Sequence, residues 1–131
     1  MKLSEHSRNR LLATLSHWDV PREFAEPMYN YLVHGFSPGG CFTAVLANDF
    51  LNAVSRSHPA NTIEAFKSLA GWIRDTVPAE AQGSYQAVES WIKLTPTARR
   101  AVLEDLDLIY TAKQETWLAI SGEKTQEPML Y

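Results

Sequence analysis

The sequence predicts an all-α fold, a compact single-domain bundle of about five to six short helices. Hydrophobic residues recur at helical spacing over most of the chain, whereas the alternation typical of half-buried strands is nearly absent. The segments between the helical patterns are short and contain proline, glycine and serine, as expected of connections in a compact domain. The chain has 131 residues, 45% of them hydrophobic, which is enough to bury one core, so we expect residues 1–131 to form one helical domain.

The first two predicted helices lie on either side of a break at residues 19–21. The first covers residues 4–17, where leucines repeat on one face. The second starts at that break or at Pro27, because a proline either opens a helix or kinks it. It ends just before Gly35, which fits a left-handed C-cap.

The next two predicted helices begin with recognisable caps. The third starts at Ser37-Pro38, where serine caps a helix and proline fits its first turn. It ends near residues 55–57, before Pro59. The fourth starts with residues 61–64, an Asn-led version of the capping box, and ends at Val77-Pro78.

The last two predicted helices follow a Gly-Ser turn and a Thr-Pro-Thr start. The fifth helix follows Gly83-Ser84 and ends at Lys93. The sixth, the C-terminal helix, covers about residues 96–120. We expect residues 121–131 to be a loose polar tail.

A carboxylate falls on the apolar face of the third predicted helix. At 100° per residue Asp49 lies near the middle of the hydrophobic stripe, and Asn48 lies to its side. A carboxylate in such a place is costly unless it is paired or hydrogen-bonded. We therefore expect Asp49 to have a dedicated partner. The candidates are an arginine, a tyrosine hydroxyl and the N–H groups of another helix start. The pair is either a polar clasp between two helices or part of a ligand site.

The turn at residues 37–40 is the second candidate for ligand binding. Its glycines leave free N–H groups at a helix start, which is the general geometry for a phosphate or carboxylate, and a simple helix cap is the alternative. The turn matches neither the P-loop nor the dinucleotide glycine pattern. The predicted ligand-binding residues are Tyr31, His34, Ser37, Gly39, Gly40, Asn48 and Asp49.

Three features are candidates for a partner-binding surface. Trp72 lies opposite the hydrophobic stripe of the fourth predicted helix, so it either meets another helix or is exposed for a partner. Leu108 points away from the hydrophobic stripe of the last predicted helix. It is either a scattered surface residue, or part of a second apolar contact, or part of a homodimer interface. Glu104 and Asp105 belong to an acidic cluster, which is a solvated face or a contact for a basic partner.

No catalytic residue, metal site or cofactor is predicted. Cys41 lies in the first turn of a predicted helix and His34 could act as its base, but no third orienting group has a recognisable spacing, so we expect a buried thiol. The four histidines lack metal-ligand spacing. A single cysteine forms no internal disulfide, and a reduced, cytoplasmic setting is the simplest interpretation.

Charge and hydropathy argue against nucleic acid and membrane partners. The net charge is −3, whereas nucleic-acid binding normally needs a basic stripe. The second and third predicted helices are joined by a short turn, as in a helix-turn-helix. The candidate recognition helix, however, has only one basic residue, Arg56, at its far end. The N-terminus lacks the apolar run of a signal peptide, and no apolar stretch is long enough for a membrane span.

One segment resembles a known family. The matching positions are Tyr31, Gly35, Pro38, Gly39, Gly40, Ala44, Val45, Leu46, Asn48 and Asp49. This pattern is similar to that of a family of small, mostly uncharacterised proteins of tailed bacteriophages and prophages, and the resemblance covers about residues 29–93. The sequence departs from the family at Gln82, at Arg74-Asp75 and at Cys41. The resemblance implies a phage or prophage origin and a helical core, and it implies no known activity.

These observations favour a non-enzymatic accessory protein that acts by binding. The resemblance makes a host protein the expected partner and inhibition of a host defence system the expected role, in the host cytoplasm. The alternatives are a protein that binds a small anionic ligand or nucleotide through the turn and Asp49, and a structural or assembly component of the virion. Alanine at Trp72 should impair binding of a host protein, and bulk at Gly39 should impair binding of a small ligand.

Overall fold

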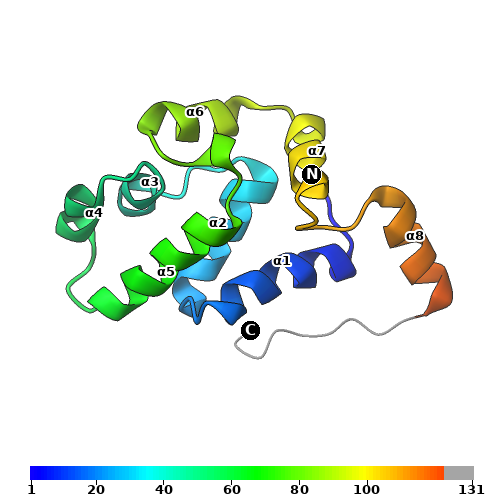
Figure 1. Cartoon of the computed structure of the whole chain (residues 1–131), viewed down its shortest axis with the longest axis horizontal. Helices are drawn as coiled ribbons and strands as arrows, with labels where there is room; N and C mark the ends of the chain where they lie inside the picture. Colours follow the sequence, from blue (N-terminus) through cyan, green and yellow to red (C-terminus); the bar gives the residue numbers. More distant parts are fainter. Residues whose placement is uncertain (123–131) are drawn as a thin grey trace.

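The computed structural model describes residues 1–122 and is built entirely from helices and turns, without a strand in that range (Figure 1). The all-α prediction is confirmed, but the predicted number of helices is wrong, because the described residues contain eight α-helices and one short 3₁₀ helix. Within residues 1–122 no helix combines the length and apolar character needed to cross a bilayer. The elements are α1 Glu5–His17, α2 Arg22–His34, α3 Gly40–Leu46, α4 Phe50–Arg56, α5 Ile63–Thr76, η1 Ala79–Ala81, α6 Tyr85–Lys93, α7 Pro96–Asp105 and α8 Ala112–Ser121.

Local capping accounts for the helices that the sequence predicts well. The Ser4 hydroxyl accepts a hydrogen bond from the backbone N–H of Ser7 and so caps α1. Gly35 ends α2 in the left-handed conformation, with φ of 68°, and donates to the carbonyl of Tyr31. Pro27 lies inside α2, which begins at the earlier of the two predicted starts.

The third predicted helix is two helices. Asn48 adopts a left-handed conformation with φ of 64°, which ends α3 and turns the chain into α4. The backbone N–H of Asp49 donates to the carbonyl of Ala44, and Asp49 then becomes the N-cap residue of α4. A single helix over residues 37–57 is therefore wrong, since asparagine tolerates the left-handed conformation that breaks it.

The last predicted helix is also two helices. The chain leaves α7 at Leu106 and turns through Asp107, whose φ is 56°. Thr111 then starts α8 with a capping box in which its hydroxyl and the Gln114 side chain each accept from the other's backbone N–H. Of the tail predicted at residues 121–131, Ser121 ends α8 and Gly122 caps it, and residues 123–131 lie outside the described part of the chain.

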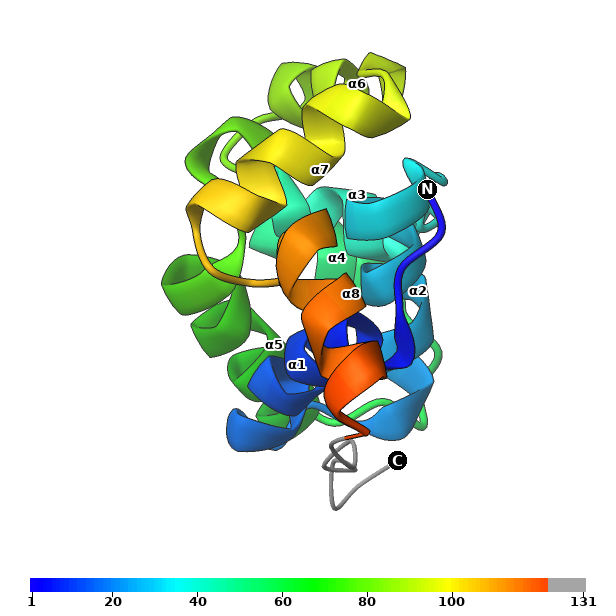
Figure 2. The ribbon, with the colours of Figure 1, turned by 90° about the vertical axis from the view of Figure 1, so that its right-hand side faces the viewer.

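The core lies among α1, α2, α3, α5, α6 and α7. The α3–α4 hairpin lies at one end and α8 at the other (Figure 1). Turned by 90°, the ribbon shows α8 crossing in front of α1, against which it packs (Figure 2). Tyr31 and Trp91 are fully buried, and the indole N–H of Trp91 donates to the Tyr31 carbonyl over 3.2 Å.

A polar cluster around Glu115 fastens α8 to the rest of the molecule. The Glu115 carboxylate accepts from the backbone N–H of Ser4 at 3.0 Å and from the Arg100 guanidinium at 2.6 Å. Arg100 also pairs with Glu104 at 2.8 Å. Although burial on its own raises the pKa of Glu115, the hydrogen bonds that its carboxylate receives, first of all from Ser4, lower it to about 2.

This cluster should make the protein less stable in acid. Since the folded pKa of Glu115 lies below its ordinary value of 4.5, its contribution is complete above that value and is lost as the pH falls from there to about 2. Allowing for solvent screening, we expect a loss of about 1 to 2 kcal/mol. Urea unfolding at about pH 5 and about pH 2.5 measures it. The E115Q variant, which does not titrate, should lose less stability than the wild type, and equal losses in both proteins would contradict this account.

Candidate functional site

An open cleft of about 420 Å³ lies beside the α3–α4 hairpin and the first residue of α6. It brings together four of the predicted ligand-binding residues, which are Ser37, Gly39, Gly40 and Asp49. Four further residues were not predicted and complete its lining, and they are Thr43, Asn52, Arg56 and Tyr85. The cleft therefore joins the turn and Asp49, which are separated in the sequence by α3.

The two glycines of the turn differ in what a side chain would meet. Gly39 has φ of 89°, a conformation that other residues rarely adopt, although a Cβ there would meet no atom within 4 Å. Gly40 has an ordinary φ, but a Cβ would lie 2.7 Å from Nη1 of Arg56. The absence of a side chain at Gly40 thus lets the Arg56 guanidinium lie against the start of α3.

A chain of hydrogen bonds runs across the cleft. The Tyr85 hydroxyl donates to Oδ2 of Asp49 at 2.6 Å, and Nδ2 of Asn52 donates to the Tyr85 hydroxyl oxygen at 3.0 Å. Nε of Arg56 donates to Oδ1 of Asn52 at 3.1 Å. The predicted dedicated partner of Asp49 is therefore confirmed as a tyrosine hydroxyl. The predicted apolar surroundings of Asp49 are wrong, because α3 ends before it and its side chain lines a polar cleft.

The cleft holds one negative and one positive side chain. The hydrogen bond from Tyr85, followed by Asn52 and the charge of Arg56, keeps the pKa of Asp49 below its ordinary value, so Asp49 is ionised at neutral pH. Among residues 1–122 no carboxylate forms an ion pair with Arg56. Within residues 1–122 the Arg56 guanidinium donates one hydrogen bond, through Nε to Asn52, which leaves Nη1 and Nη2 to bind an anionic group.

Three predicted ligand-binding residues lie outside the cleft. Tyr31 is fully buried and its hydroxyl donates to the Ala81 carbonyl at 2.9 Å, so its predicted role in ligand binding is wrong. The His34 ring is 5.4 Å from the Phe36 ring, measured between centroids, and partial burial lowers its pKa. Asn48 is exposed and lines a separate groove of about 130 Å³.

The predicted partner-binding anchors are mostly buried. Trp72 is fully buried, and its indole N–H donates to the Thr14 hydroxyl at 2.9 Å. Of the two predicted alternatives for Trp72, the structure therefore has the contact with another helix. Leu108 is buried in the core, because the turn after α7 directs it inward. The prediction that these two residues are exposed anchors is wrong. Glu104 pairs with Arg100, and Asp105 is exposed at the end of α7.

Cys41 lacks the surroundings of a nucleophile. Its thiol donates to the Ala53 carbonyl at a distance of 3.3 Å, and the side chain is partly buried. Burial raises the pKa of Cys41, which is the opposite of the shift that activates a thiolate. Among residues 1–122 no group of three or more His, Cys, Asp or Glu side chains is arranged to hold a metal ion.

The comparisons with known proteins give no relative. No protein-family model matches the chain, and no curated protein or solved structure matches it. The function proposed below therefore rests on the geometry of the cleft and on the chemistry of the residues that line it.

Proposed function

We propose that this protein is a non-enzymatic binding protein that holds a small ligand with an anionic group in the cleft beside the α3–α4 hairpin. The observation that carries the proposal is the free guanidinium edge of Arg56, which faces a cleft large enough for a metabolite. The hydroxyl groups of Ser37 and Thr43 offer further hydrogen bonds to the same ligand. Such a protein acts by sequestering or sensing its ligand.

Replacing Arg56 with glutamine should weaken retention of this ligand by about tenfold or more. The substitution removes the charge that faces the anionic group, and a charge-assisted hydrogen bond contributes about 1.5 to 3 kcal/mol, or about tenfold or more in affinity. The measurement is native mass spectrometry of tagged protein recovered from host extract. We expect a small mass on the wild-type protein and a much smaller ligand-bound fraction of R56Q.

Arg74 provides the matched control for this experiment. It is an exposed arginine that lines the separate groove with Asn48, so R74Q makes the same change of charge outside the cleft. R74Q should retain the same small mass as the wild type. A small mass that R56Q retains equally well would contradict the proposed function.

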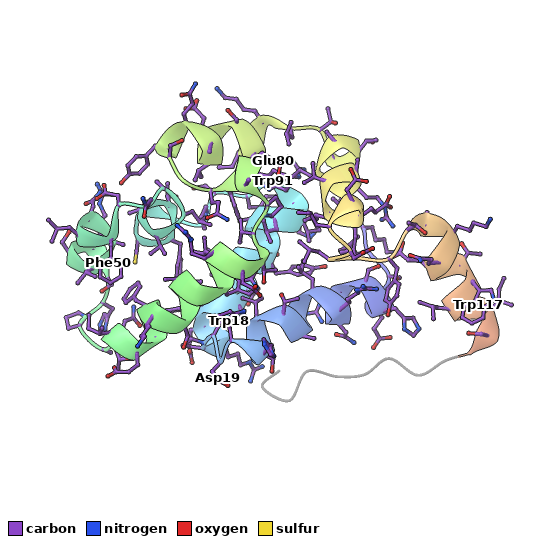
Figure 3. All side chains as sticks on the ribbon, viewed as in Figure 1. Trp18, Asp19, Phe50, Glu80, Trp91 and Trp117 are labelled. Atoms are coloured by element: carbon purple, nitrogen blue, oxygen red, sulfur yellow. The ribbon has the colours of Figure 1, made fainter. Side chains whose placement is uncertain are left out.

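A second function, binding of a host protein, is favoured by one surface observation. Trp117 and Ile120 lie three residues apart on α8, and they are 61% and 81% exposed. Figure 3 shows Trp117 on α8, at one end of the molecule. Exposed aromatic residues are frequent anchors of protein interfaces. In this proposal the protein is a phage-type accessory factor that inhibits a host defence system, and the phage setting rests on the sequence resemblance alone. A host protein recovered in a defined ratio in the same mass spectra would favour it.

A further inference from the structure

The balance of charge in the cleft restricts the class of ligand. A bare anion on Arg56 would also lie near the ionised Asp49, which repels it. An ionised carboxylate accepts about four hydrogen bonds, and Asp49 receives them from the Tyr85 hydroxyl and from Asn52, which leaves room for a further donor. A ligand that presents an anionic group to Arg56 and separate hydroxyl donors to Asp49 satisfies both side chains.

The surroundings of the cleft favour a single anionic group. Arg56 is the one basic residue among the described residues that line it. On the other side of Ser37 lies a second groove of about 410 Å³, whose lining includes Glu23 and Glu26. A second or third phosphate of a ligand would find no cation in the cleft. If the ligand extended across Ser37, these phosphates would be repelled by the glutamates of the second groove.

The remaining lining suits a sugar and a planar ring. A carboxylate that accepts from two neighbouring ribose hydroxyls is a common way to hold a nucleoside. Tyr85 is 46% exposed where it lines the cleft, so its ring is accessible for stacking. A volume of about 420 Å³ lies within the range of pockets for ligands of this size.

We propose that the cleft binds a ribonucleoside 5′-monophosphate, with the phosphate on Arg56, the ribose hydroxyls on Asp49 and the base against the ring of Tyr85. This inference rests on the proposed function and adds the ligand class to it. It assigns a separate recognition task to each of the three side chains, and matched pairs of ligands test the tasks of Asp49 and Arg56.

Isothermal titration calorimetry of the purified full chain tests the inference. The probes are adenosine 5′-monophosphate, its 2′-deoxy analogue, adenosine and adenosine 5′-triphosphate; a purine is chosen because it offers the larger stacking surface. We expect the 2′-deoxy analogue and adenosine each to bind about tenfold more weakly than the monophosphate, since each lacks one hydrogen-bonded or charged group. The triphosphate should bind no more tightly than the monophosphate.

Two variants separate the roles of the charged residues. In D49N the preference for ribose over deoxyribose should disappear, and asparagine is chosen because it also serves as an N-cap for α4. In R56Q the preference for the monophosphate over adenosine should disappear. R74Q should keep both preferences, and circular dichroism of each variant confirms that the fold is retained.

The two proposals fail in distinguishable ways. Equal affinity of the wild type for the ribose and deoxyribose ligands, tighter binding of the triphosphate, or no binding of the monophosphate would each overturn the ribonucleotide assignment. If the mass spectra still show a small mass that depends on Arg56, the proposed function stands with a ligand of another class. If that mass is also independent of Arg56, both proposals fall.

Discussion

Replacing Arg99 with methionine is expected to destabilise the protein by about 3 to 5 kcal/mol, because it leaves buried carbonyl groups without a donor. Arg99 is only 4% exposed, and its guanidinium donates to the carbonyls of Val33, His34 and Leu94. Two of these carbonyls belong to the last turn of α2, where no further backbone donor is available. The positive charge also suits the negative end of the α2 dipole.

Urea unfolding measures this effect, with R74M as the control. Arg74 is exposed, so R74M should change the free energy of unfolding by less than about 0.5 kcal/mol. R99K should lie between the two, since an ammonium group cannot reproduce the planar array of donors. A Cβ on Gly35 would lie 2.6 Å from Nη1 of Arg99, which shows how closely the guanidinium approaches the end of α2. Equal stability of R99M and R74M would show that Arg99 does not hold this junction.

Replacing Trp72 with alanine is expected to cost about 3 to 5 kcal/mol, because it leaves a cavity between α5 and α1. The indole is fully buried, and its N–H donates to the hydroxyl of Thr14 on α1. W72F keeps an aromatic ring at the site and loses the hydrogen bond and part of the buried volume, so it should cost less than W72A, about 1 to 3 kcal/mol. Thermal and urea unfolding of both variants measure these losses.

The same variants test the earlier interpretation of Trp72 as a partner-binding anchor. Because Trp72 is fully buried, W72A should lower the free energy of unfolding whether or not a partner is present. The L106A variant is a suitable control, since Leu106 is half exposed at the end of α7 and should cost much less. If W72A kept wild-type stability but no longer copurified with a host protein, the result would support Trp72 as a partner-binding residue.

Local sequence patterns are sufficient for much of the fold. Caps such as Ser4, Gly35 and Ser84 place helix ends where the structure has them, because each side chain or conformation acts on its own helix. The breaks at Asn48 and Asp107 could not be found in this way, since the hydrophobic spacing continues through both turns. The start of α8 does have a local pattern, the Thr111–Gln114 capping box, which helical periodicity alone does not indicate.

The candidate site is only partly local in origin. The turn and Asp49 could be predicted because each has a distinctive chemistry in a short segment. Asn52 and Arg56 follow Asp49 at helical spacing, so a search for polar residues on one face of α4 would have found them. Tyr85 comes from α6, and its hydrogen bond to Asp49 depends on packing between distant segments, for which the sequence has no local indication.

The position of Trp72 shows why a single hydrophobic stripe is an incomplete guide to burial. The stripe of α5 predicts one buried face, and it places Trp72 on the opposite side. Helix α1 packs against α5 and supplies Thr14 as a partner for the indole N–H, so α5 is covered on more than one face. Contacts between helices of this kind decide burial, and helical periodicity alone does not contain them.

The central claim is that the cleft beside the α3–α4 hairpin is the binding site. Backbone amide NMR spectra of the labelled protein, recorded with and without the small-molecule fraction of a host cell extract, test it most directly. We expect shifts concentrated in residues 37–56 and at Tyr85, and we expect them to be much smaller in R56Q. Shifts confined to α8 around Trp117, or cleft amides that do not change, would contradict the claim.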